Sequence, residues 1–207
     1  NSEKVHPQTK QRVREVAVEL GYKPSRVARR LRLEEGKASL LGLVIPDIQN
    51  PFFADFTRGV EDVAQAHDYG LLLSNSDEDP EKQRFVLDIL QTEEVDGVIV
   101  PPVCDEDTAI AQLLETNIAV VCVDRRMQNA RVDTILSDNR KGAYEAVSHL
   151  LELGHRRIGF IGGIPRISTL TERRQGYEQA LSDHGQAVDP ALIKETETRR
   201  ERGDRKS

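Results

Sequence analysis

Polar residues follow the apolar segments of this sequence at regular intervals, and they are the residues best suited to bind a small ligand. In chain order they are Asp47 and Asn50, Asn75 and Asp77, Asp124 and Arg125, and Asp138 and Asn139. If the apolar segments are parallel strands, these side chains gather at one edge of a sheet, where open α/β sheets bind their ligands. The pattern therefore predicts a binding site for a small molecule at that edge.

The second group of residues with a clear chemical use is the basic stretch PSRVARRLRLEEG at residues 24–36. Residues 1–37 hold ten Lys and Arg against five Asp and Glu, whereas the rest of the chain holds 19 against 30. A short basic arm on an acidic body favours a polyanion as the partner of that arm alone. A pair of ordinary solvated helices would carry the same charge, and composition does not separate these alternatives.

Residues that commonly perform catalysis or bind metals show no such arrangement. Cys104 and Cys122 lack Cys-x-x-Cys spacing, and the five histidines are scattered. Cys122 lies in an apolar run, which favours a buried thiol in a reducing compartment. The glycines of GFIGG, residues 159–163, do not have dinucleotide-binding spacing. We therefore expect no enzymatic activity, cofactor or metal. With no membrane-length apolar run and no signal peptide, we expect a cytoplasmic protein.

Apolar runs alternate with amphipathic segments along the body of the chain, and this order would position the polar residues. Strands are predicted at residues 40–45, 70–76, 97–103, 118–124, 133–139 and 156–163. Helices are predicted at residues 51–67, from Pro80 onward, at 140–153 and at 170–183. Strands that are apolar throughout are typical of a parallel sheet covered on both faces, and the βαβα order predicts a doubly wound α/β fold. After about Asp189 the pattern fades.

Two helices are predicted before the first strand. The first covers residues 7–20, with apolar residues at helical spacing along one stripe. These residues are Val13, Val16, Ala17 and Leu20. The second runs from Ser25, its N-cap, to about Leu31. Because it is too short to be stable alone, something outside the chain must hold it.

Five stretches together resemble the LacI/GalR family of bacterial transcription repressors. They are SEKVHPQTKQRVREVAVELGYKPSRVARRLR, GLVIPDIQNPFFADFTRGVEDVAQAHDYGLLLSNSDEDPEKQ, VDGVIV, LGHRRIGFIGG and ERRQGYEQAL, in family order over residues 1 to about 193. The resemblance implies a two-lobed fold of the periplasmic-binding-protein type, preceded by a small all-α DNA-binding remnant and a hinge helix. It also implies a homodimer that binds double-stranded operator DNA under control of a small effector, a sugar or a nucleobase-like metabolite.

The resemblance gives the basic stretch a role as the hinge helix, which folds when two subunits lie side by side on the operator. Leu31 matches the leucine that is inserted into the minor groove, where it unstacks a base step and bends the duplex. Packing of Leu31 against Leu20 or Val27 is the alternative. The other residues implied to lie along the groove or its phosphates are Ser25, Arg26, Ala28 and Arg29.

The resemblance further implies a set of ligand-binding residues, most of them next to the predicted strand ends. They are Asn50, Phe52, Phe53, Asp124, Arg125, Asp138, Thr169 and Arg173. Aromatic rings can stack on a sugar or base, carboxylates can accept hydroxyl hydrogens, and the arginine fork suits hydroxyl pairs or a carboxylate. Two alternatives stay open, namely Phe53 as a core residue and Asp138 as the cap of the following helix.

The sequence departs from the family pattern at both ends. The first two helices of the helix-turn-helix are absent, and only the opening strand and helix of the second lobe are recognisable. We expect residues 1–37 to end the helix-turn-helix and form the hinge, 38–139 to form the first lobe, 140–193 to start an incomplete second lobe, and 194–207 to form an off-pattern tail. A periplasmic-type solute-binding protein of transport would share this body, but SRVARRLR argues against it.

Overall fold

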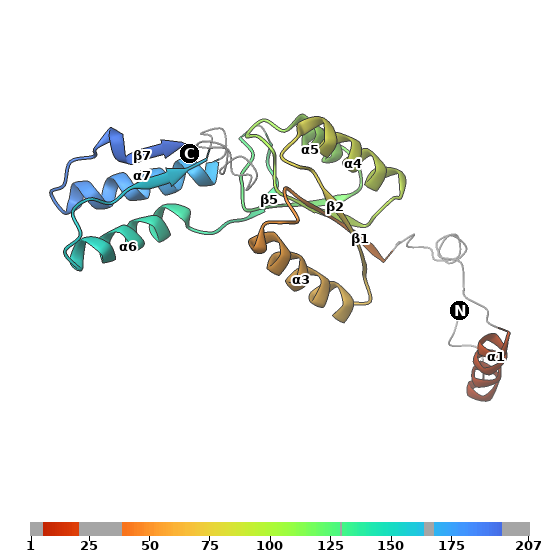
Figure 1. Ribbon diagram of the computed structural model, residues 1–207. Helices are drawn as coiled ribbons and strands as arrows, with labels where there is room; N and C mark the ends of the chain where they lie inside the picture. Colours follow the sequence, from red (N-terminus) through yellow and green to blue (C-terminus); the bar gives the residue numbers. More distant parts are fainter. Residues whose placement is uncertain (1–5, 21–38, 129, 164–167, 196–207) are drawn as a thin grey trace. The chain divides into compact units, whose positions relative to one another are not determined.

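The computed structural model describes residues 6–20, 39–128, 130–163 and 168–195 (Figure 1). The chain divides into two units at residues 1–38 and 39–207. In the first unit, helix α1 (Pro7–Glu19) confirms the predicted first helix, and its stripe residues Val13 and Val16 are exposed. The predicted hinge helix lies outside the described residues. So do the proposed DNA contacts Ser25, Arg26, Ala28, Arg29 and Leu31.

A five-stranded parallel sheet forms the centre of the first lobe in the second unit. Its strands are β1 (Leu40–Ile45), β2 (Gly70–Asn75), β3 (Gly97–Val100), β4 (Ala119–Val123) and β5 (Asp133–Ile135). They are ordered β2-β1-β3-β4-β5, and every neighbouring pair is parallel. This confirms the predicted doubly wound sheet. The order reverses between β1 and β3, so the carboxyl ends of these two strands form the topological switch point.

Helices cover both faces of the sheet because its strands are apolar on both sides. They are α3 (Pro51–Ala66), α4 (Pro80–Thr92) and α5 (Thr108–Leu113), and Figure 1 shows α3 on the face opposite to α4 and α5. Phe53 of α3 packs with Leu43 and Ile45, whereas Leu90 of α4 and Ile110 of α5 belong to the core of the other face. The sequence did not predict α5, because six residues give no periodic apolar stripe.

Polar residues at the strand ends start the helices that follow. The Asn50 Oδ1 atom accepts a hydrogen bond from the Phe52 amide at 3.1 Å, and Asp79 Oδ1 accepts one from the Glu81 amide at 2.8 Å. Asp107 caps α5 in the same way. Such caps satisfy amide donors that the first turn of a helix leaves without partners. A polar residue at this edge therefore has a structural role as well as any role in binding.

The remaining elements form a smaller second lobe. They are α6 (Asn139–Glu152), β6 (Phe160–Gly162), α7 (Ser168–Asp183), a 3₁₀ turn (Pro190–Leu192) and β7 (Ile193–Glu195). Strands β6 and β7 are parallel, and Tyr177 and Leu181 of α7 pack on Leu151 of α6. The sequence pattern was expected to fade after about Asp189, and the turn and β7 follow that point. A three-residue strand with one apolar residue carries no periodic signal.

Helices α6 and α7 lie side by side (Figure 1), and they approach closely because Gly176 has no side chain. A Cβ atom at this position would lie 2.2 Å from the carbonyl oxygen of Arg140 and 2.9 Å from the amide nitrogen of Tyr144. Both neighbours are backbone atoms, so neither can move by a simple rotamer change. This contact determines how near the part of α7 that carries Arg173 lies to the start of α6.

Cys122 of β4 is fully buried, as the sequence predicted. Burial, with a smaller contribution from the Asp107 carboxylate, raises the pKa of its thiol to about 12. The thiol therefore stays protonated at neutral pH and behaves as a small apolar core residue.

Candidate ligand-binding site

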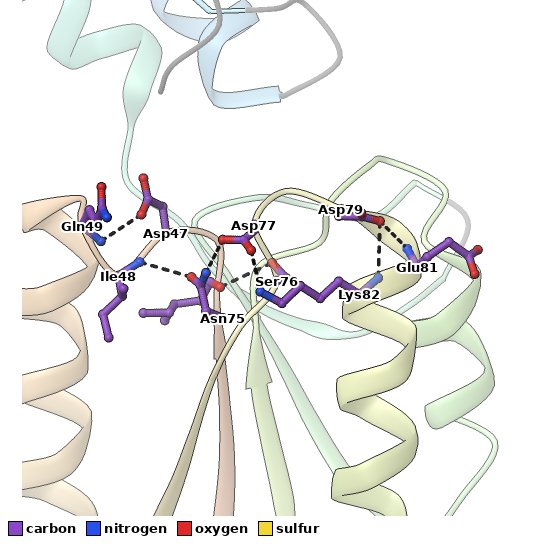
Figure 2. Close-up of polar contacts among 10 residues, drawn as sticks. Asp47, Ile48, Gln49, Asn75, Ser76, Asp77, Asp79, Glu81 and Lys82 are labelled. Carbon is purple, nitrogen blue, oxygen red and sulfur yellow. Dashed lines mark hydrogen bonds and ion pairs between the residues drawn. The ribbon is translucent and has the colours of Figure 1, made fainter. Parts of the chain in front are cut away.

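The polar residues that follow β1 and β2 meet at the carboxyl edge of the sheet, as predicted. Figure 2 shows Asp47 and Asp77 at this edge, with Asn75 joining the two loops. The Ile48 amide donates to Asn75 Oδ1 at 3.2 Å, and Asn75 Nδ2 donates to Asp77 Oδ1. Asp77 in turn pairs with the ammonium group of Lys82. This network fixes the two loops beside the switch point.

A cavity of about 220 Å³ lies where α3 begins and β4 and β5 end. The residues that line it include Phe52, Phe53 and Phe56, together with Asp124 and Ile135. The Phe52 ring centroid lies 5.0 Å from that of Phe53, edge-on, and 6.4 Å from that of Phe56, nearly parallel. The cavity thus combines an aromatic wall with one carboxylate, the pairing that a sugar with an apolar ring face and outward hydroxyls would fit.

The two phenylalanines of the NPFF motif have different surroundings. Phe52 is 50% exposed, whereas Phe53 is only 4% exposed and packs against Leu43 and Ile45. Phe53 is therefore a core residue that also forms part of the cavity wall. Phe52 is the ring with the most free surface for a ligand, since Phe56 is partly buried.

Asp124 is the carboxylate of the cavity, and its side chain is only 14% exposed. Desolvation raises its pKa above the usual aspartate value, and the Glu78 charge adds to this; Arg125 and Arg173 oppose the shift without cancelling it. A carboxylate that has lost water in this way gains from any hydroxyl donor that reaches it. Its backbone is also left-handed, with a φ of 63°, which is uncommon for a residue other than glycine.

Arg125 is buried and turned toward Glu78. Its Nη1 and Nη2 atoms donate to the two Glu78 carboxylate oxygens at 2.7 and 2.6 Å, and Nη1 also donates to the Pro102 carbonyl at 3.2 Å. Its Nε atom lies 3.6 Å from Asp124 Oδ2 and has no hydrogen-bond partner among the described residues. Arg125 thus connects the loops after β2, β3 and β4. Sequence reasoning missed Glu78, whose only local signal is the acidic run in which it lies.

The predicted residues of the second lobe meet at the start of α6. Asp138 caps this helix by accepting a hydrogen bond from the Lys141 amide at 2.9 Å, which is the structural role left open for it. The Arg173 Nε atom donates to Asn139 Oδ1 at 2.7 Å. Asn139 was one of the polar residues predicted at the strand ends, but it was not in the set of ligand-binding residues that the family resemblance implied. Thr169 is buried at the start of α7 and does not line the 220 Å³ cavity.

A larger cavity of about 340 Å³ lies between β6, β7 and α7, but its charged groups are paired with one another. Arg174, on its wall, forms ion pairs with Glu178 and Glu195, both at 2.8 Å. We therefore place the candidate site at the aromatic cavity. Within the described ranges, no three His, Cys, Asp or Glu side chains are grouped to hold a metal ion. No helix in that part of the chain has the length and apolar character needed to span a membrane.

Comparison with known proteins identifies relatives of this architecture. The sequence model for periplasmic binding proteins and the sugar binding domain of the LacI family matches residues 38–204. The HTH-type transcriptional regulator RegA of Clostridium saccharobutylicum is 35% identical over 190 residues, covering 91% of this chain and 57% of RegA. The ribose operon repressor of Halalkalibacterium halodurans is 36% identical over 179 residues, covering 86% of this chain and 52% of the repressor. This chain therefore spans about half the length of these curated relatives.

A solved structure agrees with the sequence relatives. The periplasmic binding protein/LacI transcriptional regulator from Alkaliphilus metalliredigens, complexed with D-xylulofuranose, superposes with a TM-score of 0.67 and 30% identity. The match covers 77% of this chain and 56% of that one.

Proposed function

We propose a function from the premise that this chain belongs to the family of periplasmic binding proteins and LacI-type sugar binding domains. The protein is a DNA-binding transcription regulator, most simply a repressor, whose operator binding is controlled by a sugar. It acts in the cytoplasm as a homodimer. The relatives support the regulatory part of this proposal, since two of them are a transcriptional regulator and an operon repressor by name.

One observation on this chain supports the proposal that the effector is a sugar: the half-exposed Phe52 and the desolvated Asp124 line the same cavity. A sugar can place its C–H face on the ring while its hydroxyls donate to the carboxylate. The solved relative that contains D-xylulofuranose supports a pentose-sized ligand. A transport solute-binding protein would share this site, and DNA binding separates the two functions.

Phe52→Ala is expected to weaken sugar binding about tenfold or more, because it removes the exposed ring of the cavity. Isothermal titration calorimetry with D-ribose and D-xylulose measures this loss. Phe85→Ala is the matched control, since Phe85 is 64% exposed on α4 and does not line the cavity. Equal affinities of the two variants would contradict the assignment of the cavity.

For DNA binding, we propose contacts through Ser25, Arg26, Ala28, Arg29 and Leu31. Leu31→Ala is expected to lower affinity about tenfold or more for DNA from upstream of the protein's own gene, because the inserted side chain would be lost.

Arg26→Ala is expected to reduce the slope of log affinity against log salt by about one, because one phosphate contact would be lost. Fluorescence anisotropy at several salt concentrations, with and without sugar, measures both effects. Leu33→Ala, just beyond the proposed hinge, should bind as the wild type does. DNA affinity that no sugar changes would refute the regulatory proposal.

A further inference from the structure

Glu78 is held in one position by its backbone and by its partner. Asp77 and Glu78 both have left-handed backbones, with φ of 55° and 60°, and this turn directs the Glu78 side chain toward Arg125. The side chain is only 21% exposed, and both of its oxygens accept hydrogen bonds from the guanidinium. Arg125 is 8% exposed. The pair is therefore largely desolvated and geometrically fixed, in contrast to exposed ion pairs such as Arg58–Asp62 on α3 and Arg84–Glu81 on α4.

The Glu78–Arg125 pair lies beside Asp124, which lines the cavity: Arg125 Nε is 3.6 Å from Asp124 Oδ2. The Arg125 fork would otherwise suit a phosphate, which arginine binds in the same two-point geometry. Glu78 already accepts hydrogen bonds from both Nη atoms of Arg125, so this two-point geometry is not available to a phosphate. Asp124 beside the pair carries a further negative charge. Carboxylates are numerous among the described residues at this edge of the sheet. They include Asp47, Asp77, Glu78, Asp79, Asp124 and Asp138, and the cations include Lys82, Arg125, Arg126 and Arg173.

We infer that Glu78 is a specificity-determining residue: by occupying the Arg125 guanidinium, it makes the site select an uncharged sugar and reject the phosphorylated form. A phosphate group carries about −1.5 to −2 charges at neutral pH. It would meet the Asp124 carboxylate, and the Arg125 fork, already paired with Glu78, would not be available to bind it. This inference rests on the proposed sugar-binding function and specifies the class of sugar. Glu78 acts through Arg125 and is a positioning residue.

Calorimetry with four probes tests the inference on the intact protein: D-ribose, D-xylulose and the 5-phosphates of both. The wild type is expected to prefer a free sugar over its phosphate by about tenfold or more. Glu78→Gln retains the size of the side chain but removes its charge, and it should reduce this preference about tenfold. Glu78→Asp retains the charge and should retain the preference. Glu81→Gln is the control, because Glu81 lies in the first turn of α4 and pairs with Arg84.

The ratio of two affinities separates selectivity from damage to the fold, since damage would weaken both ligands alike. A wild type that binds a sugar phosphate as tightly as the free sugar overturns the inference, and this result needs no variant. An unchanged ratio in folded Glu78→Gln, or a lost preference in Glu78→Asp, overturns it as well. If the wild type binds none of the four compounds, the proposed sugar-binding function fails, and the inference fails with it.

Discussion

Replacing Asp124 with asparagine is expected to weaken sugar binding by about 10- to 100-fold, because hydrogen bonds to a charged acceptor are stronger than those to a neutral one. Calorimetry with the sugar that the wild type binds best measures the loss. Asp79→Asn is the matched control, since Asp79 caps α4 at the same edge of the sheet and does not line the cavity. Asparagine caps helices about as well as aspartate, so this control should retain both stability and affinity.

The same Asp124→Asn variant is expected to be more stable than the wild type at neutral pH. Burial raises the Asp124 pKa in the folded state, so the protonated carboxyl group is the form that the fold favours. Its contribution to stability is fully present below the unfolded pKa of about 3.9 and is lost as the pH rises through the higher folded value. Asparagine does not titrate and avoids this loss.

Urea unfolding across the acidic to neutral range would show this effect as a stability difference that grows with pH. A variant less stable than the wild type at neutral pH, with unchanged sugar affinity, would mean that Asp124 serves the fold and does not bind the ligand.

Gly176→Ala is expected to destabilise the protein by about 2 kcal/mol or more, because its Cβ would overlap the backbone of α6. The helices would have to separate, and the hydrogen bond from Arg173 to Asn139 would lengthen. Urea unfolding measures the first effect, and weaker sugar binding would report the second if Arg173 contacts the ligand.

Gly142→Ala provides the matched control on α6, since a Cβ at Gly142 would meet no atom within 4 Å. Alanine is a better helix former than glycine, so this variant should gain about 0.5–1 kcal/mol. If Gly176→Ala is stabilising as well, α6 and α7 do not approach each other at Gly176 as closely as the structure shows.

Local patterns in the sequence determined most of the first lobe. Apolar runs predicted parallel strands, and all five strands of the sheet lie where strands were predicted, including β5, whose segment is only partly apolar. Asn50 and Pro51 predicted the start of α3 because capping depends on residues adjacent in the chain. The polar strand ends predicted the binding edge, since parallel strands place their carboxyl ends together. Elements too short to show a period, α5 and β7, gave no such signal.

Tertiary structure alone decided what those polar residues contact. Arg125 was predicted to face a ligand, but its partner Glu78 lies 47 positions away, and the Asn139 partner of Arg173 lies 34 positions away. Such pairs depend on how the sheet and helices pack, and no local pattern encodes them. The two roles of Phe53, core residue and cavity wall, likewise follow from its position between sheet and cavity. The order of residues along the chain determines which of them lie at the binding edge. Packing of the fold determines which of their hydrogen-bonding groups pair with other protein groups and which remain for a ligand.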